Sequence, residues 1–226
     1  MLNKYFLIKL IYDLCRNCFI MLKNIIFVAL ISVFLTACNS SPKTLPIYGK
    51  EAVKTETGFD TIVKPVPPFE FTDQKGDIVN NETFKDKIFI VDFFFTSCPS
   101  ICPVMTKNML KIHDHYLEND RIKYLSHSID PKRDSVQRLD MYANKIDITT
   151  NKKWHFVTGD WEEIKKMAAV YMIAANIAKD APGGYEHSGM FVLVDRKGQI
   201  RGFCNGTDEA AVSILMEDMD LLLDEK

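Results

Sequence analysis

The sequence predicts an α/β fold, a mixed central sheet flanked by helices, over residues 67–226. Apolar runs such as "KIFIVDFFF" (87–95) are typical of strands buried on both faces. Helical patterns alternate with these strands, which favours a parallel core sheet. A closing hairpin, "MFVLVD" joined to "IRGFC" by Arg-Lys-Gly-Gln, adds antiparallel strands, so a mixed sheet is expected.

The elements are expected in a simple order along the chain. An N-terminal β-hairpin extension comes first, because "FEFTDQKGDIV" (69–79) alternates apolar and polar residues around a Gly turn. After the strand at 87–95, apolar spacings of three and four predict a helix that begins at Pro103. The remaining elements are a strand at 122–130, a helix opened by a capping box at Asp134 and Gln137 and ending near Lys145, a short strand "WHFVT", a helix from Asp160 to about Ala175, the closing hairpin, and a final helix over roughly 208–223.

Length and composition bound the class of protein. The 226 residues suit one domain with an extension, and they are enough to bury a core. The 47% hydrophobic and 26% charged residues are ordinary for a folded protein. A net charge of −2 gives no reason to expect nucleic acid as a partner.

Residues 1–37 have the composition of a secretory signal peptide. Lys23 precedes the apolar run "IIFVALISVFL", and small residues follow that run. The box "LTAC" resembles the bacterial lipoprotein signal, which makes Cys38 the expected lipidation site. The alternative is an uncleaved transmembrane anchor over residues 19–37. Either attachment holds the domain at the membrane of a bacterial cell envelope, outside the cytoplasm on its periplasmic side.

Two further expectations concern the N-terminal region. Met21 would open a signal of ordinary length, so it is the expected start, and Cys15 and Cys18 then lie outside the mature protein. Residues 38–66 are polar, rich in Pro, Thr and Lys, and without a sustained period, which predicts a lipidated membrane tether. Removal of 1–37 takes away four of 28 basic and one of 30 acidic residues, so the mature chain carries −5.

Three of the six cysteines belong to the folded domain: Cys98, Cys102 and Cys204. This number is too small for a domain stapled by disulfides. Cys98 and Cys102 fall between a central strand and the next helix, where open α/β sheets place reactive groups. A helix N-terminus lowers thiol pKa, and a thiolate is both a nucleophile and a soft metal ligand. The pair is therefore a redox couple, two ligands for a metal such as copper, or an inert disulfide.

The five histidines are not equally good candidates for a third metal ligand beside Cys98 and Cys102. His187 lies in the Gly-rich loop "PGGYEHSGM", just before an apolar strand, and is the strongest candidate. His127 is expected near the carboxyl end of a strand, close to the reactive edge of the sheet. His113 and His115 are expected on the solvated side of a helix, and His155 has no signalled partner.

Four pieces of sequence in order carry a family resemblance: "FTDQKGDIV", "FFFTSCPSICP", "SIDPKRDSVQRLDMYA" and "EHSGMFVLVDRKGQIRG". Over roughly residues 65–223 the chain resembles the SCO/SenC family of copper-delivery proteins. The resemblance implies a thioredoxin-like fold and copper, as Cu(I) or Cu(II), held by Cys98, Cys102 and His187. It also implies delivery to the copper-bearing subunit of cytochrome c oxidase during its assembly, or to another copper protein.

The chain departs from the family pattern at three positions. Glu186 replaces the usual Asp, which keeps the carboxylate. Cys204 stands where an aromatic residue is common; it is expected to be a small buried residue, although a third thiol could trap a mixed disulfide. Asp92 lies six residues before Cys98, as in the "VDF" pattern of thioredoxin, whose Asp assists proton transfer. The alternative is a strand-end Asp satisfied by local hydrogen bonds.

Two functions remain open from the sequence. The first is a metallochaperone, which need not be an enzyme. The second is a membrane-anchored thiol–disulfide oxidoreductase in which Cys98 is the nucleophile, Cys102 the resolving thiol and Asp92 an assisting group. Asp130, in the "SIDP" turn, either assists the metal or caps the chain.

Overall fold

The computed structural model describes residues 44–55, 58–178, 180 and 184–225. Residues 44–226 form one compact unit. The expected signal peptide, the lipidation site Cys38 and the alternative anchor over 19–37 lie outside the described residues. Within the described part of the chain, no helix has both the length and the apolar character needed to span a bilayer.

The elements alternate as the sequence predicts. The strands are β1 (Lys50–Thr55), β2 (Gly58–Val63), β3 (Glu70–Asp73), β4 (Ile78–Asn80), β5 (Ile88–Phe94), β6 (Ile122–Ser128), β7 (Trp154–Thr158), β8 (Ala175–Ile177), β9 (Tyr185–His187), β10 (Met190–Val194) and β11 (Ile200–Asn205). The helices are the 3-10 helix η1 (Asn81–Phe84), α2 (Cys102–His115), α3 (Val136–Lys145), α4 (Trp161–Val170) and α5 (Glu209–Asp224).

Seven strands form the central sheet, in the order β11-β10-β5-β6-β7-β3-β4. β5, β6 and β7 are parallel, and the other neighbours in the sheet are antiparallel. The predicted mixed sheet is thus confirmed. The predicted N-terminal hairpin forms as β3 and β4, which extend the sheet beyond β7.

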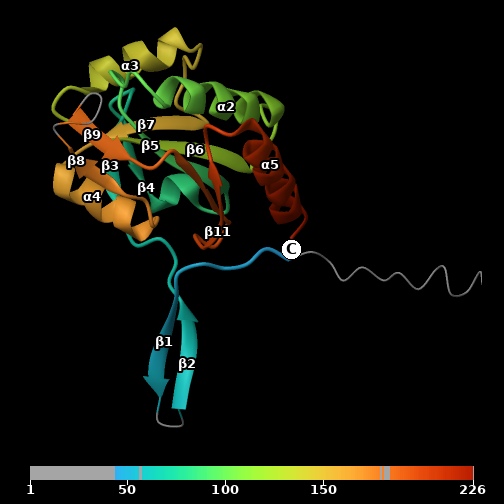
Figure 1. Cartoon of the computed structure of the whole chain (residues 1–226). Helices are drawn as coiled ribbons and strands as arrows, with labels where there is room; N and C mark the ends of the chain where they lie inside the picture. The colour runs from blue at the N-terminus through green and yellow to red at the C-terminus, as the bar shows by residue number, and fades with distance from the viewer. Residues whose placement is uncertain (1–43, 56–57, 179, 181–183, 226) are drawn as a thin grey trace, which may run out of the picture. The chain divides into compact units, whose positions relative to one another are not determined.

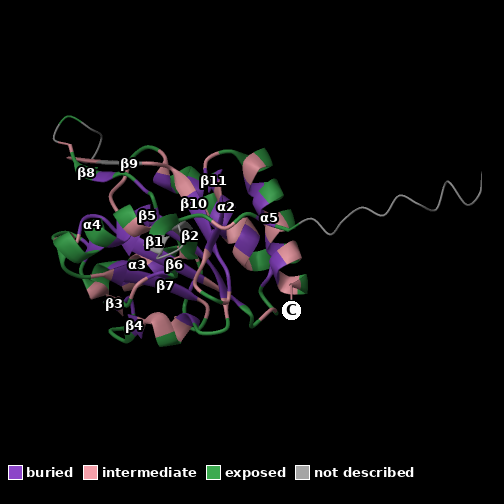
Figure 2. Ribbon diagram, turned by 90° about the horizontal axis from the view of Figure 1, so that it is seen from below, coloured by how far each residue is buried: buried purple, intermediate pink, exposed green. Residues whose placement is uncertain are grey.

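Helices cover both sides of this sheet. In Figure 1, α2 and α3 lie above the strands and α4 lies below them, while α5 packs on β11 beside α2. All seven residues of β5 are buried, as expected for a strand covered on both faces. Figure 2 shows the same pattern across the sheet, with buried residues in the strands and exposed residues on the outer helix surfaces. Each fully buried Ile or Phe side chain contributes about 1.5–3 kcal/mol to this core.

The structure adds two strand pairs that the sequence pattern does not signal. β1 and β2 pair antiparallel, with Lys50 opposite Val63, inside the segment predicted to be an irregular tether. The described side chains of β1 are exposed, so no buried face imposes an alternating pattern. β8 and β9 pair with Ala175 opposite His187. At three residues each they are too short for periodicity to reveal.

Two helix ends also differ from the prediction. The capping box at Asp134 is wrong: Ser135 caps α3, and its hydroxyl accepts from the backbone N–H of Arg138 over 3.3 Å. Helix α4 begins after the predicted cap Asp160, but it ends at Val170 rather than near Ala175. There Met172 adopts a φ of 57°, which turns the chain out of the helix.

Candidate metal centre

Cys98 and Cys102 lie between β5 and α2, at the carboxyl end of a central strand. Cys102 opens α2, and Pro103 follows it in the first turn, where a proline costs no helical hydrogen bond. The backbone N–H of Cys98 donates to the carbonyl of Phe95 over 3.1 Å and turns the chain as it leaves the strand. Cys98 is half-buried and Cys102 is only 3% exposed.

The two sulfurs interact directly, and they titrate differently. Burial raises the pKa of the Cys98 thiol, but hydrogen bonds from the Cys102 thiol and from the backbone of Ser100 and Cys102 outweigh it, so that pKa lies below its ordinary value. Burial and the hydrogen bond given to Cys98 raise the pKa of Cys102 well above its ordinary value. Cys98 therefore loses its proton first, and Cys102 keeps a proton to donate.

Asp134 holds the loop that carries Cys98. Its buried carboxylate accepts from the backbone N–H of Thr96 over 3.0 Å and from the Thr96 hydroxyl over 2.5 Å. The same carboxylate accepts from the Ser128 hydroxyl over 2.6 Å. These bonds tie the cysteine loop to the end of β6, which explains why Asp134 is not used as a helix cap.

Asp92 lies on β5 opposite Ser126 of β6. The Ser126 hydroxyl donates to the Asp92 carboxylate over 2.5 Å, and the indole N–H of Trp154 donates to the Ser126 oxygen over 2.8 Å. Burial raises the pKa of Asp92 to about 7, although the bond from Ser126 lowers it. The charge of Asp92 in turn helps to raise the pKa of Cys102, so the carboxyl and the buried thiol are electrostatically coupled.

His187 lies on β9, and residues on both sides of it lie near the segment that carries the cysteines. Two positions before it, the ring of Tyr185 lies 5.5 Å from the ring of Phe95, measured between centroids. Two positions after it, Gly189 lies near Ile101, because a Cβ added to this glycine would be in ordinary van der Waals contact with the Ile101 Cδ1 atom at 3.4 Å. The structure describes the backbone of His187 but not its side chain. Strand β9 therefore passes beside the loop between Cys98 and Cys102.

A family model for SCO1/SenC proteins matches residues 61–219. The chain belongs to the SCO1/SenC family. The resemblance first seen in short motifs therefore covers nearly the whole domain. The observed fold is the thioredoxin-like fold of this family.

Three solved structures illustrate the likeness. A SCO1/SenC family lipoprotein from Bacillus anthracis has a TM-score of 0.65 and 26% identity, and the match covers 71% of this chain and 95% of that one. BsSco is a member of the Sco family of cytochrome c oxidase assembly proteins, and a disulfide switch was identified in it. Its TM-score is 0.60 and its sequence identity 26%, and the match covers 73% of this chain and 96% of BsSco. Bradyrhizobium japonicum ScoI, solved with copper bound, has a TM-score of 0.54 and 25% identity, and the match covers 68% of this chain and 99% of that one.

The other histidines of this SCO1/SenC chain lie in different surroundings. His127 is fully buried, and burial lowers its pKa to about 3. His155 has a partner that the sequence did not signal, since its Nδ1 lies 3.0 Å from a carboxylate oxygen of Asp73. The prediction that His113 is solvated is wrong, because its side chain is 12% exposed and packs on aromatic rings. His115 is exposed, as predicted.

Two of the positions at which the chain departs from the family pattern, Cys204 and Glu186, have simple placements. Cys204 is buried on β11, and burial raises the pKa of its thiol to about 12. The side chain of Glu186, like that of His187, lies outside the described part of the structure. Among the side chains that are described, no three His, Cys, Asp or Glu residues cluster as a metal site.

Sequence reasoning missed the residues that support the site. Tyr185 could have been noticed, because an aromatic residue two positions from a candidate ligand in a Gly-rich loop needs a packing partner. Thr96 and Ser126 carry no such signal, since their roles depend on contacts with Asp134 and Asp92 across the sheet.

Proposed function

We propose that this chain is a copper-binding metallochaperone that delivers copper to the copper-bearing subunit of cytochrome c oxidase during assembly. Cys98, Cys102 and His187 hold the ion, which is cargo rather than a resident cofactor. The observation that carries the proposal is the passage of β9 beside the cysteine loop: Tyr185 packs on Phe95 before His187, and Gly189 lies near Ile101 after it.

The donor set fits this cargo. Two thiolates and an imidazole select soft or borderline ions, notably Cu(I) and Cu(II), whereas a structural zinc site takes four protein ligands. Hydrogen bonding already favours loss of the Cys98 proton, as ligation requires. The pair must be reduced before it can bind the ion. Copper bound to the Bradyrhizobium japonicum relative supports the assignment.

We also propose that Cys38 is lipidated and holds the domain at the membrane of a bacterial cell envelope, outside the cytoplasm. The relative from Bacillus anthracis is a lipoprotein, which supports this placement. Labelled palmitate should enter the wild-type chain and should not enter Cys38→Ala. Equal labelling of both chains would contradict the proposal and leave the transmembrane anchor as the alternative.

A copper titration tests the metal site. Reduced full-length protein in an uncharged detergent is compared with His187→Ala, and a Cys98→Ser chain gives the baseline for the other cysteines. One copper per chain is expected above that baseline. Substitution of residues that only hydrogen-bond to the ligands costs about 10–100-fold in metal affinity, so loss of the ligand His187 itself should cost at least about 100-fold. His115→Ala, an exposed histidine on α2, is the matched control. Full affinity in His187→Ala would reject the assignment.

The opposed thiol pKa values favour a second candidate, thiol–disulfide exchange. The Cys98 thiolate attacks a disulfide of a partner and forms a mixed disulfide, while the partner's first thiolate leaves. Cys102 then gives up its proton, with Asp92 as acceptor, and attacks the Cys98 sulfur. The partner's second thiolate leaves, so the partner is reduced and the Cys98–Cys102 pair is oxidised. Cys102→Ser should then accumulate the mixed disulfide, and His187→Ala should exchange at the wild-type rate.

A further inference from the structure

A groove of about 330 Å³ lies beside the proposed metal site, between α2 and α3. Both Cys98 and Cys102 line it. Its apolar wall includes Leu110, Tyr142 and Ile146, and two cationic side chains, Lys107 and Lys145, belong to its lining. A polypeptide lying in this groove would therefore be next to the reactive sulfurs.

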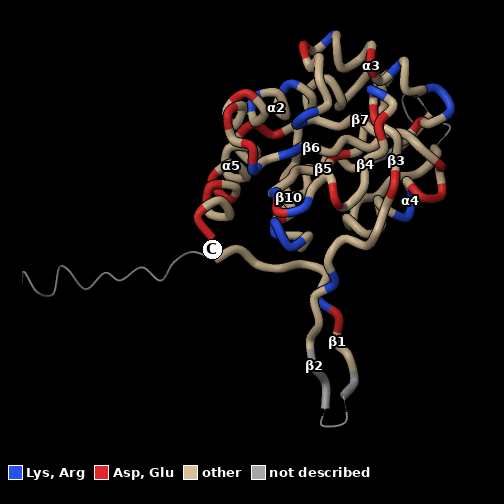
Figure 3. Tube along the Cα trace, turned by 180° about the vertical axis from the view of Figure 1, so that it is seen from behind, with Lys and Arg blue, Asp and Glu red and all other residues tan. Residues whose placement is uncertain are grey.

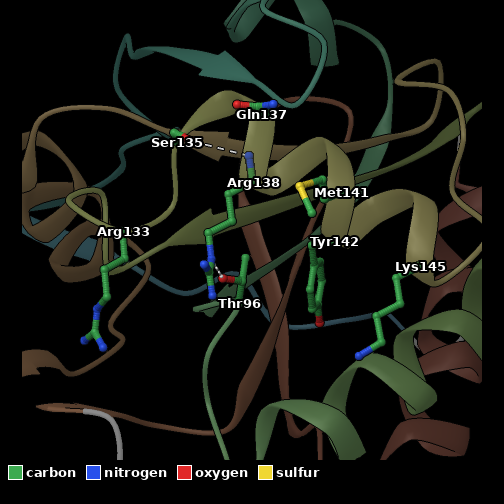
Figure 4. A pocket seen from close by; sticks show the side chains of 8 residues that line it. All are labelled: Thr96, Arg133, Ser135, Gln137, Arg138, Met141, Tyr142 and Lys145. Carbon is green, nitrogen blue, oxygen red and sulfur yellow. Dashed lines mark hydrogen bonds between the residues drawn. The ribbon is translucent and has the colours of Figure 1, made fainter.

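The groove continues into a second hollow of about 540 Å³, with which it shares Thr96, Tyr142 and Lys145. Arg133 and Arg138 add two more cations there. Figure 4 shows Arg138, Tyr142 and Lys145 extending from α3 toward the same side, as the spacings of four and three residues require. None of the described residues that line either hollow is acidic.

The positive charge of this surface is only partly compensated. Arg133 pairs with Asp130, and the Arg138 guanidinium donates to the Thr96 hydroxyl over 2.7 Å and pairs with Asp134 over 3.6 Å. Lys107 and Lys145, both exposed, form no ion pair with any residue in the described part of the chain. The helix α5, in contrast, carries five acidic and no basic residues, and Figure 3 shows red residues along its length. The cations at the groove are thus a local feature of a chain whose net charge is negative.

We propose that this groove docks an extended segment of a partner polypeptide that carries a carboxylate next to an apolar side chain. The apolar side chain packs on Leu110, Tyr142 and Ile146, and the carboxylate faces Lys107 or Lys145. Apolar burial supplies affinity, while the charges set orientation and speed of encounter. The inference rests on the proposed function, since the docked partner is the protein that exchanges copper or disulfides at Cys98.

The test uses three activated tripeptides: acetyl-Glu-Leu-Cys-amide, acetyl-Gln-Leu-Cys-amide and acetyl-Lys-Leu-Cys-amide, each as its 2-thiopyridyl disulfide. The Cys98 thiolate forms a disulfide with the peptide, and pyridine-2-thiolate leaves. Full-length Cys102→Ser protein in uncharged detergent retains the adduct, and peptide mapping by mass spectrometry measures its rate of formation at Cys98. At low salt the Glu peptide should react at least about tenfold faster than the Lys peptide, and salt should shrink this ratio.

Variants locate the effect in the groove. Lys145→Glu should abolish the preference for the Glu peptide. Lys165→Glu, an equal charge change at an exposed site on α4 across the sheet, should preserve it. Equal rates for the three peptides, or equal losses in both variants, would overturn the proposal. Replacing the peptide's Leu with Ser should slow the reaction severalfold. An unchanged rate would also overturn the proposal, because negative charge alone, such as that of a lipid headgroup, would then be enough for binding at the groove.

A second measurement does not depend on the reactivity of Cys98. Addition of acetyl-Glu-Leu-Ser-amide to wild-type protein should shift the NMR amide signals of Leu110, Tyr142 and Ile146, and Lys145→Glu should suppress these shifts. Shifts confined to other surfaces would reject the groove. Copper binding is measured without any peptide, so failure of the docking proposal and failure of the copper proposal are distinguishable.

Discussion

The Tyr185 hydroxyl donates a hydrogen bond to Oδ1 of Asp130 over 2.9 Å. Asp130 is 1% exposed, and its other carboxylate oxygen pairs with Arg133. Tyr185 precedes His187 by two residues on β9, whereas Asp130 lies just after β6. The bond therefore ties the strand of the proposed third ligand to the carboxyl end of the central sheet. This bond predicts a role for Asp130 beyond capping the chain, namely to position β9.

Tyr185→Phe should weaken both the fold and copper binding. Loss of a hydrogen bond to a charged group such as the Asp130 carboxylate costs about 1.5–3 kcal/mol of unfolding free energy. We expect copper affinity to fall by about tenfold, in the range that outer-shell substitutions produce. The measurements are a copper titration and a denaturant melt of the same variant. Tyr48→Phe, on a partly exposed ring that packs on Phe203, is the control. An unchanged copper affinity in Tyr185→Phe would show that Asp130 does not act through β9.

Asp92→Asn should stabilise the protein at high pH. The folded-state pKa of about 7 lies above the ordinary 3.8, so folding favours the protonated carboxyl. The contribution of Asp92 to the unfolding free energy is therefore largest below about pH 4 and is lost as the pH rises from about 4 to about 7. The loss is at most about 1.4 kcal/mol per pH unit. The full loss is on the order of 4 kcal/mol and is constant above pH 7.

Denaturant melts of wild-type and Asp92→Asn chains at several pH values measure this effect. The variant should be more stable than wild type by a few kcal/mol at pH 8, and the gain should disappear near pH 4. Asp114→Asn, on a 73% exposed side chain, should show no such trend. A gain that does not change with pH would mean that Asp92 is not forced to ionise in a buried site.

Much of the fold follows from the sequence because burial leaves a pattern. The strand at 87–95 is continuously apolar because β5 is covered on both faces. Helix α2 keeps its period because its buried residues, such as Met105, Met109 and Ile112, face the sheet. The ends of helices were less predictable. Met172 takes the left-handed conformation that usually marks a Gly, so no residue type announces where α4 stops.

The residues of the candidate site also divide into those that the sequence reveals and those that it does not. Cys98, Cys102 and His187 are visible in the sequence because their residue types are chemically distinctive. Their supports are not, because hydrogen bonds between distant segments leave no periodic signal. Asp134 illustrates this: its spacing to Gln137 matches a capping box, yet contacts with Thr96 and Ser128 across the sheet decide its role.

Asp134→Asn should loosen the cysteine loop. The amide removes one acceptor from a fully buried cluster and adds donors with no place to bond, which costs about 1–3 kcal/mol of unfolding free energy. We expect alkylation of Cys98 by iodoacetamide to change severalfold, because Thr96 is no longer fixed two residues before it. Asp140→Asn, on the more exposed side of α3, is the control. Equal alkylation rates in wild type and Asp134→Asn would show that the loop keeps its position without this carboxylate.

Arg201→Met should destabilise the domain by about 3–5 kcal/mol, because it leaves buried negative charge without its partner. The guanidinium is 7% exposed and donates to Asp195 over 2.9 Å and to both carboxylate oxygens of Glu225 over 2.7 and 2.8 Å. It also donates to the carbonyls of Leu45 and Pro46, so one side chain joins the start of the described chain to its last helix. A denaturant melt measures the loss.

The control is an ion pair of similar length with far greater exposure. Lys64 and Glu51 lie 2.6 Å apart on side chains that are 61% and 56% exposed, so Lys64→Met should cost less than about 1 kcal/mol. Lowering the pH should reproduce part of the destabilisation expected for Arg201→Met. The hydrogen bond from Arg201 lowers the pKa of Glu225 below its ordinary value, so this contribution is present above the unfolded-state pKa and is lost as pH falls through the folded one. If both variants cost the same, or if Arg201→Met keeps the acid dependence of wild type, Arg201 is not the cation that holds the two ends together.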